Sequence, residues 1–423
     1  MSDRKRLLSN MASLFTLQGA NYVLPLVTLP YLVRVLGPEK FGLIAFAQAF
    51  IQYFVVATDY GFNLSATREV AVHRNNPQKL GEIISAVMAI KTLLALAGAA
   101  ILGAFTLMVP TFHQQWPLYL VVYLTVAGAT LFPAWLFQGL ERMRDITWMN
   151  MATRLLTTAA IFIFVHNPQD YVLAAAIQSL PVLLAAVPAW WVLRKARSIT
   201  WQLPQSKAMH VQIKSSWHVF LSTAAINVYT SSNTFVLGLI AGPVAVGYFS
   251  AANKVVQATV GLLSPISQTI YPHIAQIAIR SREETINFIR KSLFYMSTFG
   301  LALSAILFIW ASAVIRIVLG DSFLPSVPIL QWLSLFPFIL ALNNIYGMQT
   351  LLPLGLKKLF TKSVAISATV DIILLYPLVS SYGADGAAIT MLTTEIVLFG
   401  IYTVFHYSNG IYLISFPQIK KAI

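Results

Sequence analysis

The 423-residue sequence contains no cysteine, few charged residues and only isolated histidines. Without cysteine, disulfide bonds, thiol catalysis and thiolate metal sites are excluded. The seven histidines are scattered singly, and no pair has the spacing of a zinc site. None of the motifs HExxH, GxSxG, Walker A or GxGxxG occurs in a context that would give it a chemical role. The sequence therefore predicts no catalytic residue, no metal site and no cofactor, and it does not indicate an enzyme.

Charged residues make up only 10% of the chain, whereas soluble domains contain about 25%. Hydrophobic residues make up 57%, and the mean hydropathy is +0.72. Because one membrane span takes about 20 apolar residues, the chain has room for a dozen helices joined by short loops. No long hydrophilic segment remains for a soluble domain. The composition predicts an all-α polytopic membrane protein.

Windows of about 19 residues predict twelve spans, which divide equally between two halves. Their limits are 9–33, 41–61, 82–108, 118–138, 150–166, 171–193, 216–240, 246–270, 293–318, 327–350, 361–380 and 384–406. The fifth is the weakest, because Arg154 and two threonines dilute it. We expect one six-helix lobe at residues 1–205 and a second at 206–423.

The basic residues predict how the chain is oriented in the membrane. With the N-terminus inside, 23 of the 28 lysines and arginines lie in inner segments, three lie outside (Arg34, Lys40, Arg316) and two within spans (Lys91, Lys254). The positive-inside rule therefore predicts cytoplasmic termini. The basic residues of these inner segments account for most of the net charge of +14, so no nucleic-acid partner is expected. The apolar run that follows Arg4-Lys5-Arg6 is interrupted by polar residues and proline, and we interpret it as an uncleaved first helix.

Two stretches, 205 residues apart, share a polar pattern inside apolar spans. The first contains Gly37-Pro38 and Phe41-Gly42, followed by Gln48, Gln52, Asp59 and Asn63. The second contains Gly242-Pro243 and Val246-Gly247, followed by Asn253, Gln257, Ser264 and Gln268. In each, the polar residues fall at i, i+4, i+11 and i+15, which on a continuous helix lie within an arc of roughly 60°. We name these sets the first and second polar stripes.

A polar stripe on a membrane helix has to face protein or a water-filled cavity. The seventh span has a similar polar face, formed by Ser216, Thr223, Asn227, Ser231 and Thr234. The matched stripes predict a duplicated transporter with a wet cleft lined by spans two, seven and eight. The alternative is that these amides only form hydrogen bonds with neighbouring helices.

Several ionisable residues lie in or at the ends of the predicted spans. They are Lys91, Lys254, Asp371 and Glu395 within spans, and Arg34 and Asp59 at span ends. A charge at mid-bilayer costs about 2.5–3.5 kcal/mol on insertion scales, so these side chains are not expected to face lipid. In a transporter, the cations would bind an anionic substrate and the acids would bind H⁺ or Na⁺. The alternative is structural ion pairing between helices, or side chains that reach to the interface.

Specific motifs in both halves resemble those of Wzx-type O-antigen and polysaccharide flippases. They are Tyr31–Pro38 with Phe41-Gly42, Asp59–Leu64 with Ala66-Thr67, Trp135–Glu141 with Met143, Gly242-Pro243, Gly247, Ala251–Lys254, Pro265–Gln268 and Tyr271-Pro272. This resemblance implies the fold of MATE-type exporters, in which two six-helix lobes form a V and spans one, two, seven and eight line the cleft. It implies that the substrate is an O-antigen unit linked to undecaprenyl diphosphate, moved from the cytoplasmic to the periplasmic face by alternating access.

With the resemblance, the polar and charged residues become candidates for two roles. The substrate-binding candidates are Arg34, Gln48, Gln52, Lys91, Asn227, Asn253, Lys254, Gln257 and Gln268. The candidates for gating or for coupling to H⁺ or Na⁺ are Asp59, Asp371 and Glu395. The expected location is the bacterial inner membrane, and the expected partners are membrane lipid, the O-antigen polymerase and the chain-length regulator.

Three other functions remain open at this point. A lipid II flippase or a MATE-type drug antiporter would share the fold. The O-antigen polymerase is an enzyme that acts on the same lipid-linked units, but it needs a sizeable periplasmic loop, and every outer loop predicted here has about a dozen residues or fewer.

Overall fold

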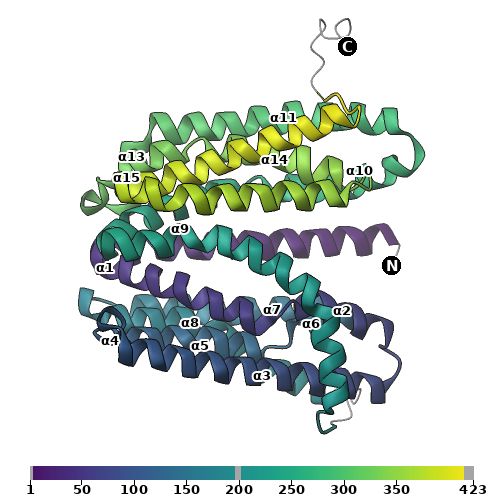
Figure 1. Ribbon diagram of the computed structural model, residues 1–423, viewed down its shortest axis with the longest axis horizontal. Coiled ribbons are helices and arrows are strands. Elements are labelled where there is room, and N and C mark those ends of the chain that lie inside the picture. The colour runs from purple at the N-terminus through teal and green to yellow at the C-terminus, as the bar shows by residue number, and fades with distance from the viewer. Residues whose placement is uncertain (1–2, 196–201, 414–423) are drawn as a thin grey trace, which may run out of the picture. The chain divides into compact units, whose positions relative to one another are not determined.

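A computed structural model describes residues 3–195 and 202–413, with side chains from Val27 onward except at positions 226, 228 and 229. The described part is built from helices and contains no strand (Figure 1). The predicted all-α class is therefore confirmed, and each of the twelve predicted spans falls on helical structure.

Three of the helices are long and sharply kinked at a glycine. They are α1 (Asp3–Asp59), α9 (Ser206–Gly261) and α15 (Lys357–Ser408), and each contains one predicted span and all or most of a second. The kinks lie at Gly37 (φ 72°), Gly242 (φ 79°) and Gly383 (φ 56°), in the left-handed region that favours glycine. Gly37 and Gly242, 205 residues apart, have nearly the same backbone conformation. The structure thus repeats the Gly-Pro turn that the sequence predicts.

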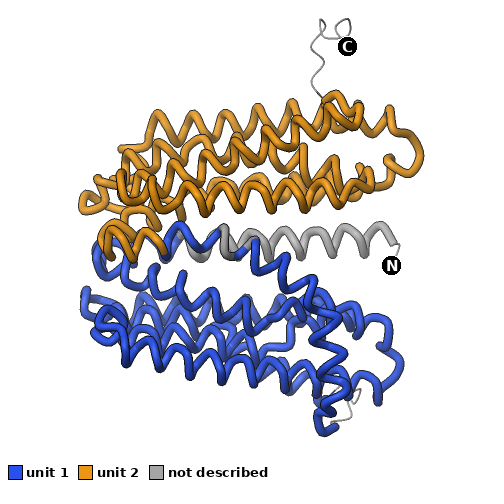
Figure 2. Tube along the Cα trace, viewed as in Figure 1, with its two compact units in different colours: residues 1–235 blue, residues 236–423 orange. Residues whose placement is uncertain are grey.

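The chain forms two compact units, residues 1–235 and residues 236–423 (Figure 2). The first unit contains α1, the N-terminal part of α9 and the helices between them. These are α2 (Phe62–Val72), α3 (Pro77–Met108), α4 (Pro110–His113), α5 (Trp116–Leu131), α6 (Ala134–Gly139), α7 (Met143–Phe164), η1 (Pro168–Asp170) and α8 (Tyr171–Lys195). Its core includes the fully buried Phe62, Trp135 and Phe137. Helices α5 and α8 approach closely because Gly128 has no Cβ, which would lie 2.8 Å from the backbone nitrogen of Leu183.

The second unit contains the rest of α9, all of α15 and the helices between them. These are α10 (Ser264–Arg280), α11 (Arg282–Ile309), α12 (Ala311–Val314), η2 (Ile315–Leu319), η3 (Asp321–Phe323), α13 (Ser326–Leu333), α14 (Phe336–Asn343) and η4 (Asn344–Leu351). Gly300 of α11 allows close packing on α14, because an added Cβ would lie 2.8 Å from the carbonyl oxygen of Pro337. The core of this unit includes Met296, Ile345 and Tyr402.

The boundary between the units lies at Phe235, thirty residues beyond the predicted lobe boundary at residue 205. The N-terminal part of α9 belongs to the first unit because it contacts α2 and the turn before it. Ser216 lies 2.6 Å from Ser65 between hydroxyl oxygens, and Phe220 stacks on Tyr60 with ring centroids 4.7 Å apart. The division into two six-helix lobes stays a prediction.

Eight helical stretches among the described residues are long and apolar enough to cross a membrane. One of them, Lys357–Ser408, includes two predicted spans, and another, Val27–Val72, includes the second predicted span and the end of the first. Helix α7, which contains the fifth and weakest predicted span, is not among the eight.

Several predicted spans are interrupted, which the hydropathy windows did not predict. The fourth is broken at Pro133, and α10 and α14 begin with Pro265 and Pro337 in their first turns. Proline lacks an N–H and is tolerated at the start of a helix, so a proline inside an apolar window marks where a new helix begins.

Candidate functional site

The two glutamines of the first polar stripe lie on the second half of α1 and bond to two other helices. Gln48 donates from Nε2 to Oε1 of Gln178 on α8 at 3.4 Å. Gln52 donates from Nε2 to Oδ1 of Asn227 on α9 at 3.3 Å. One residue further, the hydroxyls of Tyr53 and Ser232 lie 3.1 Å apart. The structure therefore joins the predicted second and seventh spans through polar side chains. We call these six residues the amide seam.

The amide seam is half-buried and lies beside an aromatic layer. Gln48, Gln52, Tyr53 and Asn227 are all of intermediate exposure. Phe235 stacks on Phe46 and on Phe50, each with ring centroids 5.5 Å apart. Each amide side chain offers two donor hydrogens and a carbonyl acceptor, so the seam keeps hydrogen-bonding capacity for a ligand.

The last members of each stripe lie on a different helix from the first members. Helix α1 ends at Asp59, and Tyr60 (φ 47°) and Gly61 (φ 77°) turn the chain before α2, which contains Asn63. In the second stripe, α9 ends at Gly261, and Ser264 and Gln268 lie on α10. The prediction of one continuous arc was therefore wrong beyond Asp59 and Gln257. Gly61 and Pro265 could have indicated these breaks, because glycine favours a turn and proline favours the first turn of a helix.

Asp59 and Lys91 form a buried ion pair at the end of α1. Lys91 Nζ lies 3.6 Å from Asp59 Oδ1 and donates to the carbonyl oxygen of Ala129 at 2.8 Å. The Lys91 side chain is only 2% exposed and the Asp59 side chain 15% exposed. Asn63 also donates to the Asp59 carboxylate, from its backbone and its side chain. These contacts connect the α1–α2 turn to α3 and α5, which is the structural alternative that the sequence left open.

The second polar stripe has different surroundings within the second unit. Asn253 Oδ1 is buried and accepts no hydrogen bond among the described residues, whereas Lys254 and Gln257 have exposed side chains. Gln268 donates from Nε2 to Ser264 Oγ at 3.0 Å, so two stripe members bond to each other. Arg34, near the kink of α1 in the first unit, is also exposed.

Asp371 and Glu395 are buried inside the second unit. Asp371 is fully buried and accepts a hydrogen bond from Thr394 Oγ1 at 3.1 Å, across the two halves of α15. Glu395 is 5% exposed and accepts from Asn343 Nδ2 at 2.6 Å, which connects α15 to α14. A hydroxyl group thus contacts the Asp371 carboxylate, and an amide group contacts the Glu395 carboxylate.

A polar cluster that the sequence did not predict lies between α10 and η4. Gln349, fully buried, donates from Nε2 to the carbonyl oxygen and the hydroxyl of Ser267 at 2.9 and 3.0 Å. Asn344 Oδ1 also bonds to Ser267 Oγ. Asn344 and Gln349 lie five residues apart on η4, a π-helix, in which residues at that spacing face the same side. This cluster could have been predicted from the amide side chains in the otherwise apolar tenth span.

Known proteins resemble this chain over almost its whole length. A family model described as "Polysaccharide biosynthesis protein" matches residues 7–278. An Escherichia coli (strain K12) protein named "Putative O-antigen transporter" is 35% identical over 408 residues, covering 96% of this chain and 98% of the relative. The chain belongs to the polysaccharide biosynthesis protein family.

The structural comparisons show the fold of this family member. An inward-facing multidrug resistance MATE family transporter of the MOP superfamily has a TM-score of 0.72, at 14% identity, and covers 91% of this chain and 94% of its own. Lipid II flippase MurJ in an inward closed conformation has a TM-score of 0.74, also at 14% identity, and covers 94% and 87%. The predicted MATE-like fold and the resemblance to polysaccharide flippases are confirmed. The chain is a multi-pass membrane transporter rather than an enzyme.

Proposed function

We propose that the chain moves O-antigen units linked to undecaprenyl diphosphate from the cytoplasmic to the periplasmic face of the bacterial inner membrane, by alternating access and with both termini cytoplasmic. The printed name of the E. coli relative and the fold shared with a lipid II flippase support a lipid-linked glycan as the substrate. The observation that carries the proposal is the amide seam, in which Gln52, on a helical stretch long and apolar enough to span a membrane, pairs with Asn227 of α9.

The energetics of moving a sugar explain why such a seam is needed. An oligosaccharide crossing hydrocarbon unaided would cost on the order of tens of kcal/mol, because each unpaired polar group costs several. Amides that already pair with one another can exchange those bonds for sugar hydroxyls at little net cost, because both states satisfy the same donors and acceptors. Groups such as Gln48, Gln52 and Asn227 therefore suit a neutral, hydroxyl-rich headgroup.

The charged part of the substrate requires cations, and the buried acids suit ion coupling. Arg34 and Lys254 are exposed and are proposed to bind the diphosphate or acidic sugars. Asp371 with Thr394, and Glu395 with Asn343, are proposed to bind H⁺ or Na⁺ during the transport cycle. Asp59 is proposed to act in gating through its pair with Lys91.

Deleting the gene tests the proposed function. We expect lipid-linked units to accumulate at the cytoplasmic face and lipid A core without O-antigen to reach the surface, as seen on gels of extracted lipopolysaccharide. Expression of the intact chain should restore O-antigen. Single units attached to the core would instead indicate a polymerase. Normal O-antigen together with increased drug sensitivity would indicate a drug antiporter.

Replacing Lys254 with alanine should reduce O-antigen display while the protein level stays constant. A hydrogen bond to a charged group contributes about 1.5–3 kcal/mol, so transport should fall about ten- to a hundredfold. Lys291→Ala, at an exposed lysine near the start of α11, is the matched control and should leave display unchanged. Normal display of the Lys254 variant at native expression would assign Lys254 to structure.

A further inference from the structure

Three amide side chains in the second unit connect the buried Glu395 to α10. Asn343, the last residue of α14, donates from Nδ2 to Glu395 Oε2 at 2.6 Å and to the Glu395 backbone oxygen at 3.0 Å. The next residue, Asn344, contacts the hydroxyl of Ser267 on α10 through its Oδ1. Gln349 donates to the same serine at 2.9 and 3.0 Å. We call Asn343, Asn344 and Gln349 the amide relay.

The contact between Asn343 and Glu395 indicates which cation the carboxylate can bind. An amide N–H directed at an ionised carboxylate forms a charge-assisted hydrogen bond, about twice as strong as a bond between neutral groups. Hard metal cations take oxygen ligands, whereas this amide presents hydrogens to the carboxylate. Among the described residues, no group of three or more His, Cys, Asp or Glu is placed to hold a metal. The surroundings of Glu395 therefore suit H⁺ better than a metal ion.

Asn343 has an acceptor that only the protonated carboxyl could use. Its Oδ1 is buried and has no hydrogen-bond partner in the part of the chain that the structure describes. A protonated carboxyl has an O–H to donate, and rotating the amide by half a turn would direct Oδ1 toward it. The same rotation breaks the bond from Nδ2 to the Glu395 backbone oxygen, so the end of α14 would be held less tightly. Asn343 can thus respond to the charge of Glu395.

The π-helix η4 begins at the next residue and has a geometry that its side chains maintain. In an α-helix, residues five positions apart point about 140° away from each other. In η4, Asn344 and Gln349 both reach Ser267, and Gln349 Nε2 donates to Asn344 Oδ1 at 3.3 Å. A return to α-helical geometry would separate Gln349 from Ser267. Segments of π-helix are rare and are frequently found at functional sites, and η4 can serve as an element with two arrangements.

We propose that Glu395 binds H⁺ and that the amide relay couples its protonation to the position of α10. Ser267 directly precedes Gln268, an exposed substrate-binding candidate, so a shift of α10 would move that side chain. Because coupling between two sites is reciprocal, substrate bound at α10 would also change the proton affinity of Glu395. Asn344 and Gln349 are positioning residues in this scheme. The inference rests on the proposed function, from which it takes the transport cycle.

Other ionisable groups near Glu395 have to be separated from it in a test. Of the elements that pack closely on α15, α13 and α14 contain no acid or base, and η4 contains only Tyr346, which stacks on His406. On α15 itself, Tyr402 and His406 follow Glu395 by seven and eleven residues and therefore share its face. Asp371 contacts the neighbouring Thr394. A response that belongs to Glu395 must therefore disappear when Glu395 alone is replaced.

Distance measurements by electron paramagnetic resonance test the proton site. The chain contains no cysteine, so spin labels attach only at introduced cysteines. Gln276→Cys on α10 and Thr369→Cys on α15 are both exposed positions in the second unit. In the full chain in detergent, we expect the distance between the labels to change between acidic and neutral pH, with or without Na⁺. Glu395→Gln, which resembles the protonated carboxyl, should show the acidic distance at both pH values.

Two results would overturn the proton site. One is a change of distance that follows Na⁺ at constant pH. The other is a pH response that persists in Glu395→Gln, which would assign the response to another group such as His406. An unchanged distance under all conditions would overturn the coupling to α10.

Gln349→Leu tests the relay, because it removes both hydrogen bonds to Ser267. We expect the pH-dependent change of distance to be lost, while the infrared band of the protonated Glu395 carboxyl still appears at acidic pH. That band is identified by its loss in Glu395→Gln, and a variant that merely unfolds would not retain it. Ser267→Ala removes the hydroxyl contacts from the α10 side and should give the same result.

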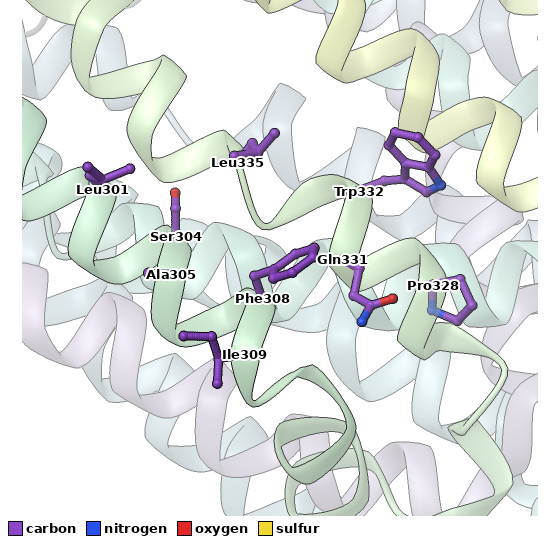
Figure 3. Close-up of a pocket in the computed structure, with 9 residues that line it drawn as sticks. All are labelled: Leu301, Ser304, Ala305, Phe308, Ile309, Pro328, Gln331, Trp332 and Leu335. Carbon is purple, nitrogen blue, oxygen red and sulfur yellow. The ribbon is translucent and has the colours of Figure 1, made fainter.

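Gln331→Leu is the matched control for the relay. Gln331 is an exposed amide that lines a pocket of about 570 Å³ beside α11 and α13, and it belongs to none of the relay contacts (Figure 3). This variant should keep the full pH-dependent change of distance. If Gln349→Leu and Ser267→Ala also keep it, the amide relay does not couple Glu395 to α10.

This inference and the proposed function fail in different ways. If the unmodified chain restores O-antigen in the deletion strain but α10 does not respond to pH, the relay is wrong and the proposed function stands. If α10 responds to pH through Glu395 but the chain restores no O-antigen, the relay serves another cargo and the proposed function is wrong.

Discussion

Replacing Gly386 with alanine is expected to remove most of the folded protein from the membrane. Gly386 follows the kink of α15 at Gly383, where the two halves of that helix lie against each other. A Cβ added at Gly386 would lie 2.0 Å from the carbonyl oxygen of Leu378 and 2.5 Å from its carbonyl carbon. Both atoms belong to the backbone, so the clash cannot be relieved by turning a side chain. Overpacking usually costs about 1–3 kcal/mol, and we expect the upper end of that range or more.

Gly400 provides a matched control on the same helix. Nothing lies within 4 Å of a Cβ added there, and the residue is exposed. Gly400→Ala should be neutral or stabilising by up to about 1 kcal/mol, because alanine favours a helix more than glycine does. The measurement is the thermal unfolding midpoint of the detergent-solubilised chain, together with its yield on size exclusion. Equal midpoints for the two variants would show that the halves of α15 are not in close contact.

Individual helices could be predicted from the sequence, because hydropathy and turn residues are local signals. The Gly-Pro pairs at residues 37–38 and 242–243 predicted the kinks of α1 and α9, and the structure has left-handed glycines at both. The breaks after Asp59 and Gly261 were missed, because a window of 19 residues averages over a two- or three-residue turn.

The partners of the polar residues were harder to predict, because a stripe identifies a helix face but not the helix that covers it. Asn227 and Gln52 were both predicted to line one cleft, and the structure brings them together. Gln178 was missed as the partner of Gln48, because a single amide in an apolar span has no pattern. The duplicated stripes also differ: the two glutamines of the first bond to neighbouring helices, whereas Asn253 Oδ1 of the second accepts no hydrogen bond from the side chains and backbone that the structure describes.

The pairing of Asp59 with Lys91 depends on how two helices are rotated against each other, so no sequence spacing could give it. Breaking this ion pair is expected to lower the stability of the folded protein strongly. Lys91→Met leaves the Asp59 carboxylate buried without its cation, and removing one partner of a buried ion pair typically costs about 3–5 kcal/mol. Asp59→Asn should be costly for the converse reason, because the buried Lys91 ammonium would lose the carboxylate charge that pairs with it. Both single variants should therefore unfold at lower temperature than the unmodified chain.

The double variant Asp59→Asn, Lys91→Met separates a structural role from a transport role. Replacing both charges removes the buried unpaired group, so we expect thermal stability to recover to near that of the unmodified chain, with a coupling energy well above the 0.5 kcal/mol expected for independent sites. Thermal unfolding of all four proteins in detergent gives that coupling, and additive losses would show that the two residues do not pair.

O-antigen display then completes the test. If the stable double variant restores display, the pair only fastens the α1–α2 turn to α3 and α5. If it is stable but fails to restore display, the charges themselves act in transport, because folding no longer explains the loss.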